Sequence, residues 1–302
     1  MTDSVRWDLD GAVATITLNR PQARNALTAE LKNELLAALR QAASSQQVRA
    51  VLITGAGQAF CAGQDLREHA ELLEAATAGA VPRDANPAAG APPSGAPAAH
   101  VPAGAASAVG PPPPADTPAP LDTVREHYNP LVLAIRSMPK PVIAAVNGVA
   151  AGAGAGLAFA CDIRIAAQGA SFLMAFARVG LAADTGVSWT LPRLAGAGLA
   201  AELLMLAEPI RAPRALELGL VSQVVEDADL PVTAGALAAR LAAGPTAAYA
   251  GIKEQLNFAA GHSLAAALDK EAEVQGLLGG TADHQAATLA FTRKQEPRFL
   301  GR

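Results

Sequence analysis

Strand-like and helical segments alternate along the first two thirds of the sequence, and helical segments dominate after about residue 195. VRWDLDGAVATITL has the apolar alternation and central Asp-Gly typical of a β-hairpin. The apolar runs VRAVLITG and KPVIAAVNG are typical of buried strands, and the spacing of Leu31, Leu35 and Leu39 predicts a helix that Thr28 caps. This order of elements predicts an α/β core with a helical C-terminal region.

The composition changes between residues 77 and 120, where proline, alanine and glycine prevail and large apolar side chains are almost absent. Such a segment cannot bury enough surface to offset the entropy lost on ordering. We therefore predict three parts: an α/β core from residues 1–76 and 121–195, a disordered surface insertion at 77–120, and a mainly helical region at 196–302.

Charge and cysteine content exclude several classes of protein. Charged residues make up 17% of the chain, below the typical ~25%, which predicts that other subunits cover part of the surface. The net charge of −4 and the lack of a basic tract argue against nucleic-acid binding.

No apolar run reaches the ~18 residues of a membrane span, and MTDSVRWDLDG lacks the features of a signal peptide. Two cysteines, too few for a disulfide framework, fit a reducing cytoplasm.

Two glycine-rich turns follow predicted strands. The turn GAGAG, residues 152–156, fails the dinucleotide-binding spacing because Leu157 and Phe159 occupy the places where the last glycine would fall. The turn can still present backbone N–H groups, uncovered by side chains, at the start of a helix. Alternatively, its small residues allow the helix to pack closely against its neighbours. FCAGQDL, residues 60–66, has the same character. Two such turns could direct two N–H donors at one oxygen, as in an oxyanion hole.

A single carboxylate, Asp184, lies in the apolar stretch GLAADTGVSW. It is either a surface turn residue or a base in a dry pocket. The sequence around Ser188 does not form a nucleophile elbow, because it lacks the second glycine of that motif. No two of the five histidines have metal-ligand spacing, so we predict no metal.

As a set, the segments LNRPQARNALT, FCAGQDL, KPVIAAVNGVAAGAG, ACDIRIAA, GLAADTG and GLVSQVV resemble the crotonase, or enoyl-CoA hydratase/isomerase, superfamily. The resemblance implies an α/β spiral of repeated ββα units, a helical C-terminal trimerisation region, and homotrimers or hexamers. It also implies acyl-CoA thioester substrates, with coenzyme A as part of the substrate and no separate cofactor.

The resemblance further implies roles for single residues. The backbone N–H groups of Gln64 and Ala153 match the family's oxyanion hole. The residues expected along the substrate and its CoA are Arg24, Ala26, Ala62, Gly63, Asp65, Leu66, Gly154, Phe176 and, as a phosphate contact, Lys253.

The sequence departs from the hydratases of this family at both of their catalytic glutamates, where it has Gly156 and Phe176. Asp184 stands where related isomerases place a catalytic aspartate. Hydration divides its proton transfers between two groups, whereas one carboxylate can move a proton between two carbons of one substrate. We therefore predict an isomerase with Asp184 as its base.

Within the superfamily, FCAGQDL, YNPLV, NGVAAGAGA and MAFARVGL are most similar to the phenylacetate-pathway isomerases, which convert a ring epoxide into an oxepin thioester. Three alternatives stay open. They are an isomerase of aliphatic enoyl-CoAs, a hydratase of fatty-acid oxidation that uses another acid such as Glu68, and an inactive trimeric scaffold that binds CoA thioesters.

Overall fold

The computed structural model describes residues 3–79 and 123–301. Its contacts divide the chain into two units, Met1–Asp65 with Thr123–Arg302, and Leu66–Asp122. Within the second unit the described part is one helix, α2 (Leu66–Gly79). Most of the insertion predicted at 77–120 lies outside the described residues.

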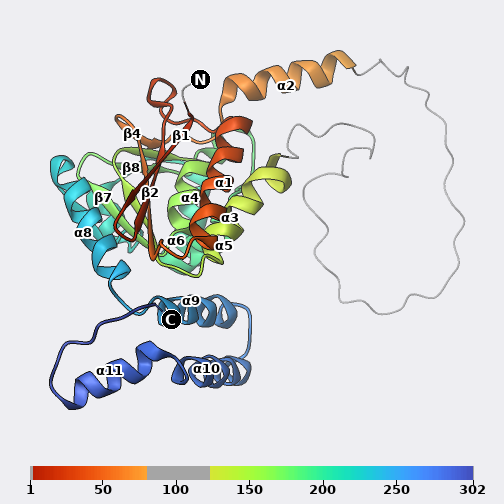
Figure 1. The fold of residues 1–302 in the computed structure, drawn as a ribbon. Coiled ribbons are helices and arrows are strands. Elements are labelled where there is room, and N and C mark those ends of the chain that lie inside the picture. Colours follow the sequence, from red (N-terminus) through yellow and green to blue (C-terminus); the bar gives the residue numbers. More distant parts are fainter. Residues whose placement is uncertain (1–2, 80–122, 302) are drawn as a thin grey trace, which may run out of the picture. The chain divides into compact units, whose positions relative to one another are not determined.

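The first unit contains two sheets (Figure 1). The large sheet has the order β1 (Val5–Asp10), β2 (Val13–Leu18), β3 (Ala50–Gly55), β5 (Val142–Val146), β7 (Ile163–Ala167) and β10 (Gln223–Val225). The small sheet has the order β4 (Ala59–Cys61), β6 (Val149–Ala151), β8 (Ser171–Leu173) and β9 (Ile210–Arg211). β1 pairs antiparallel with β2 and β9 with β8, and all other neighbours are parallel.

Successive strand pairs divide between the two sheets. β3, β5 and β7 each join the large sheet, and β4, β6 and β8, which follow them, join the small one. Asn147 fixes one of these bends: its side chain donates to the Gly57 carbonyl at 2.9 Å and accepts from the Gly55 amide at 3.2 Å. The chain thus repeats strand, strand and helix, and carries the loops after the small-sheet strands to a common edge.

Helices cover both faces of the large sheet (Figure 1). α1 packs on β1 and β2, and α8 crosses β3, β5 and β7 on the other side. The helices of this unit are α1 (Ala29–Ser44), α3 (Asn129–Arg136), α4 (Ala153–Ala160), α5 (Val187–Ala195), α6 (Ala197–Leu206), α7 (Ala212–Glu217), α8 (Leu230–Ala242), α9 (Thr246–Ala259), α10 (Leu264–Gly279) and α11 (Ala282–Thr292). Shorter helical turns are η1 (Pro21–Ala23), η2 (Val124–Tyr128), η3 (Ala175–Val179) and η4 (Asp227–Asp229).

Local sequence signals account for several of these elements. The predicted hairpin forms as β1 and β2, with Asp10 opposite Val13. Thr28 caps α1 as predicted, because its Oγ1 accepts the Leu31 amide at 3.2 Å. β5 is buried along its whole length, as its continuous apolar run indicates. Among the described residues, no helix has the length and apolar character needed to cross a bilayer.

Candidate active site

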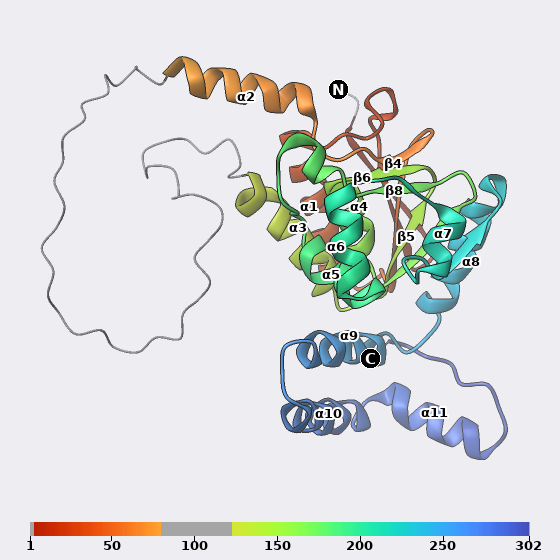
Figure 2. The same cartoon turned by 180° about the vertical axis from the view of Figure 1, so that it is seen from behind.

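Two turns lie side by side where β4 and β6 end (Figure 2). Gly63 adopts φ +89°, a left-handed conformation that favours glycine. A Cβ at Gly63 would lie 2.7 Å from the Ala151 carbonyl oxygen and 3.6 Å from the Ala153 amide nitrogen. The turn after β4 therefore lies directly against the start of α4.

The amides of Gln64 and Ala153 are the two donors that these turns present. Ala153 is the first residue of α4, where helix amides lack an intrahelical partner. Neither amide donates a hydrogen bond within the described part of the chain, whereas their neighbours Asp65 and Gly152 donate to Leu27 and Leu173. Two free donors from adjacent turns, one of them at a positive helix end, can stabilise a developing oxyanion.

Segment 20–27 runs along the first of these turns. Leu27 pairs with Gln64 as a parallel bridge, and the Ala62 amide donates to the Arg24 carbonyl at 3.0 Å. Arg20 reinforces this contact, since its Nη1 lies 2.9 Å from Asp65 Oδ2 and 2.6 Å from the Ala26 carbonyl. The structure thereby brings Arg24, Ala26 and residues 62–65 together.

Asn25, which the sequence reasoning did not identify, holds this segment in place. It is fully buried with φ +56°, and its Nδ2 donates to the carbonyls of Ala59 and Phe60 at 2.8 and 3.2 Å. An asparagine between short turn segments tolerates this left-handed conformation. Its place in RNALT was the available signal, but the carbonyls that accept from its Nδ2 lie more than 30 residues away.

The loop that carries Asp184 packs over the first turns of α4. A Cβ at Gly156 would overlap the side chain of Thr185, which is 1% exposed. Thr185 Oγ1 in turn donates to Asp184 Oδ1 at 3.0 Å. Gly156 therefore makes room for Thr185, and Thr185 orients the carboxylate.

Burial raises the pKa of Asp184 from 3.8 to about 6, against the lowering effects of the Thr185 hydrogen bond and the positive charge of Lys32. The carboxylate is half-buried. A group with this pKa is ionised at neutral pH and holds a proton firmly enough to return it, which suits a general base. Phe176 is 6% exposed and lies 3.9 Å from a Cβ built on Gly152, so it forms an apolar wall beside the second turn.

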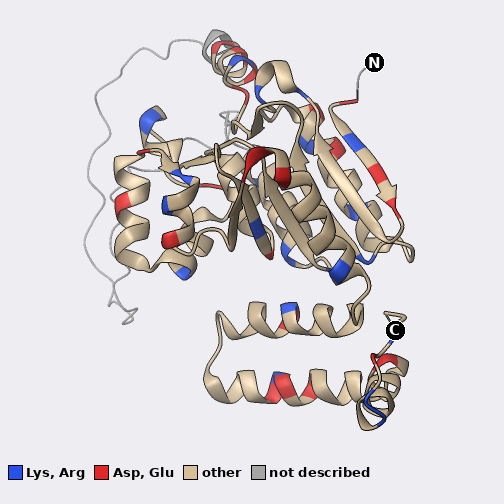
Figure 3. Cartoon of the chain, turned by 90° about the vertical axis from the view of Figure 1, so that its left-hand side faces the viewer, with Lys and Arg blue, Asp and Glu red and all other residues tan. Residues whose placement is uncertain are grey.

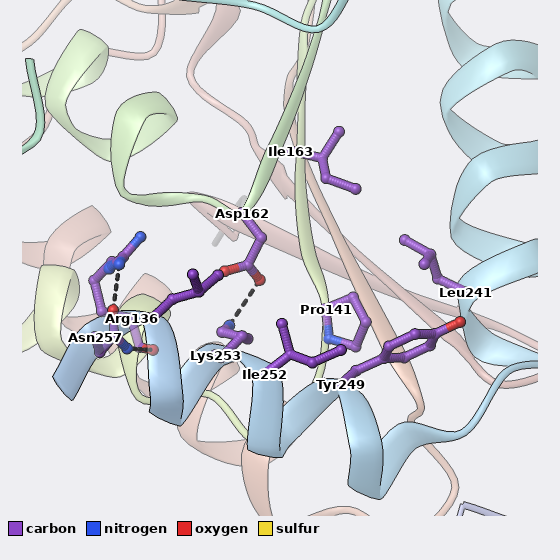
Figure 4. Close-up of a pocket in the computed structure, with 10 residues that line it drawn as sticks. Arg136, Pro141, Asp162, Ile163, Leu241, Tyr249, Ile252, Lys253 and Asn257 are labelled. Atoms are coloured by element: carbon purple, nitrogen blue, oxygen red, sulfur yellow. Dashed lines mark hydrogen bonds and ion pairs between the residues drawn. The ribbon is translucent and has the colours of Figure 1, made fainter. Parts of the chain in front are cut away.

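Lys253 lies in a different environment, beside a cavity of about 240 Å³ (Figure 4). Its Nζ lies 2.7 Å from Asp162 Oδ2 and donates to the carbonyls of Ile135 and Lys140 at 3.2 and 3.0 Å. These three partners use the three protons of the ammonium group and anchor α9 to the core. Contact with a CoA phosphate stays a prediction that would require exchanging these partners.

Two candidates lie on α2, the helix of the second unit. Leu66 is its first residue, and Glu68 lies in its first turn. Their expected roles stay predictions. The two cysteines, Cys61 and Cys161, are buried, and burial raises the pKa of each thiol to about 12. Among the described residues, no group of His, Cys, Asp and Glu is arranged to hold a metal ion.

Sequence reasoning also missed Lys32, which is 2% exposed. It precedes Leu35 and Leu39 of α1 by three and seven residues and so shares their buried face. A lysine in an apolar helical stripe was the available signal.

The chain is similar to known proteins over nearly its full length. Residues 8–84 and 115–302 match the family model described as enoyl-CoA hydratase/isomerase. A probable enoyl-CoA hydratase of Rhodobacter capsulatus is 40% identical over 99% of this chain and 98% of its own length. The 1,2-epoxyphenylacetyl-CoA isomerase of Escherichia coli is 38% identical over the whole of both chains.

Solved structures agree with this. An enoyl-CoA hydratase/isomerase-type protein of Mycobacterium abscessus superposes with a TM-score of 0.82 at 40% identity, covering 99% of this chain and 100% of the other. The predicted fold class, an α/β spiral with C-terminal helices, is confirmed.

Proposed function

Because the chain belongs to the enoyl-CoA hydratase/isomerase family, whose members act on acyl-CoA thioesters, we propose that it is an isomerase with Asp184 as its single base. The observation that carries this proposal is the position of Asp184. Its carboxylate is half-buried, oriented by Thr185, and carried by a loop packed on the helix whose first amide is an oxyanion donor.

The proposed reaction moves one proton within the substrate. Asp184 takes a proton from a carbon that the thioester makes acidic, and the electron pair moves to the thioester oxygen. The amides of Gln64 and Ala153 stabilise the resulting enolate. Protonated Asp184 then returns the proton to another carbon of the conjugated system, so no atom is gained or lost. Phe176 limits access of water to the intermediate.

The absence of the family's two hydratase glutamates favours isomerisation over hydration. A side chain at Gly156 would overlap Thr185, so this arrangement leaves no space for a glutamate there. Phe176 offers no carboxylate at the second position. Hydration is the second candidate function, supported by the name of the Rhodobacter relative, and it would require another acid such as Glu68.

The isomerase of Escherichia coli suggests the substrate class. We propose a ring-epoxide or unsaturated acyl-CoA, with the CoA running along Arg24, Ala26, residues 62–65 and Gly154.

We expect the purified protein to isomerise a 3-enoyl-CoA or a ring-epoxide thioester with a kcat/KM at least ~10²-fold above that for crotonyl-CoA hydration, because a water-activating carboxylate pair is missing. Absorbance assays on one panel of acyl-CoAs, with product identity from mass spectrometry, measure both reactions. Hydration as fast as isomerisation would overturn the proposed function.

We also propose assembly into trimers or hexamers through the C-terminal helices. α9–α11 expose large apolar side chains, among them Leu256 (65%), Leu264 (76%) and Phe291 (85%). Figure 3 shows few charged residues along α9. Apolar surface of this kind is typical of subunit interfaces.

Light scattering should therefore give three or six times the mass of one chain. Phe291→Asp should lower the assembled fraction, whereas Leu9→Asp, the same kind of change on β1, should not. A monomeric wild-type protein at micromolar concentration would contradict the assembly.

A further inference from the structure

A buried polar network connects one oxyanion donor to α1. Lys32 Nζ lies 3.3 Å from Gln64 Oε1 and 2.6 Å from Thr123 Oγ1, and 5.0 Å from the centroid of the Tyr128 ring. The Tyr128 hydroxyl also donates to Gln64 Oε1. The side chain of Gln64 is therefore held by two donors, and both come from residues that are at most 2% exposed.

This anchoring acts on the backbone of Gln64 as well. The bridge to Leu27 restrains the turn on one side, and the bonds to Oε1 restrain the side chain. With both ends held, the peptide plane that carries the Gln64 amide has little freedom to turn away from a bound oxygen.

Lys32 also acts on the other half of the site. Its positive charge stabilises ionised Asp184 and so lowers the pKa of that carboxyl, in opposition to burial. Burying an ammonium group destabilises the fold unless polar partners surround it. The polar partners of Lys32 are Thr123 and Gln64, and the backbone amide of Gln64 is one of the proposed oxyanion donors.

We propose that Lys32 is a positioning residue that, with Tyr128, orients the oxyanion donor Gln64. This inference rests on the proposed isomerase function and extends it to a residue outside the family's motifs. Lys32 acts through the side chain of Gln64.

The influence of Lys32 on the pKa of Asp184 must be distinguished from that of the other charged and titratable groups nearby. The Thr123 hydroxyl bonds His127 Nδ1 at 3.1 Å, and Tyr128 contributes its phenol. α4 carries no titratable residue, and η3 carries the exposed Arg178. η2 also carries Arg125 and Glu126, and His127 is the histidine among these neighbours.

The test uses four variants of the full chain and the pH dependence of isomerase kcat/KM. Lys32→Met removes both the charge and the hydrogen bonds, so activity should fall about 10-fold or more, and the acidic limb should move to higher pH. Lys32→Gln removes the charge but keeps a donor, so the limb should move with a smaller loss of kcat. Tyr128→Phe should lower kcat without moving the limb, and His127→Gln should also leave the limb in place.

A ¹³C-carboxyl titration of Asp184, assigned with Asp184→Asn, provides a readout independent of turnover. The pKa of Asp184 should rise in both Lys32 variants. If the wild type isomerises acyl-CoAs but Lys32→Met and Tyr128→Phe both keep the wild-type kcat, the inference fails and the proposed function stands. If the wild type shows no isomerisation while the titration shifts, the proposed function fails and the effect of Lys32 on Asp184 remains.

Discussion

Asp184→Asn is expected to reduce isomerase kcat by at least ~10²-fold while preserving affinity for CoA thioesters. Asparagine nearly matches aspartate in volume and can still accept the Thr185 hydroxyl, but it cannot take up a proton. The proposed oxyanion donors are backbone amides of Gln64 and Ala153, so the substitution leaves them in place. Steady-state kinetics with calorimetric binding of a substrate analogue separates turnover from affinity.

The same variant should be more stable than the wild type at pH 8. The folded-state pKa of Asp184, about 6, exceeds its ordinary 3.8, so ionisation disfavours folding, and this penalty develops as the pH rises from about 4 to 6. Removing it should raise the free energy of unfolding above pH 6 by ~1–3 kcal/mol, with the gain lost near pH 4. Asp229→Asn, on an exposed turn, should change neither activity nor stability. Wild-type isomerase turnover by Asp184→Asn would refute the single-carboxylate mechanism.

Gly154→Ala is expected to reduce activity by ~10²-fold or more and to lower the melting temperature, because it separates the two turns that carry the proposed oxyanion donors. A Cβ at Gly154 would overlap the backbone carbonyl oxygen of Cys61, and it would lie 2.8 Å from the carbonyl carbon. Neither backbone can yield by a side-chain rotation, so α4 must shift away from β4. The Ala153 amide would move with it.

Gly198→Ala is the matched control. Gly198 lies in α6, where a Cβ meets no described heavy atom within 4 Å. Alanine is the better helix former by ~1 kcal/mol, so this variant should be slightly more stable and fully active. Thermal melts and isomerase assays of both variants provide the measurement. A Gly154→Ala protein with wild-type turnover would show that the spacing of the two turns is not critical.

Elements with strong local signals were predictable from the sequence. The hairpin of β1 and β2, the buried strand β5 and the Thr28 cap depend on residues close together in the chain. The small sheet was predicted less completely. The sequence predicts that the glycine-rich turn at 152–156 directly follows the strand KPVIAAVNG. In the structure a separate strand, β6, lies between them. A strand of three residues is too short for its periodicity to be recognised.

The candidate site divides in the same way. Glycine at 63, 154 and 156 and a lone carboxylate in an apolar loop are visible in the sequence, and together with the family resemblance they are the basis for predicting the oxyanion turns and Asp184 as the base. The raised pKa of Asp184, the support of the turn by Asn25 and the buried position of Lys32 depend on contacts between segments tens to more than a hundred residues apart. Lys253 shows the same dependence, since its ion pair with Asp162 joins α9 to the core. Residue type and short-range spacing identify which groups could react, whereas burial and charge pairing arise only when distant segments pack together, and these set the protonation and orientation of each group.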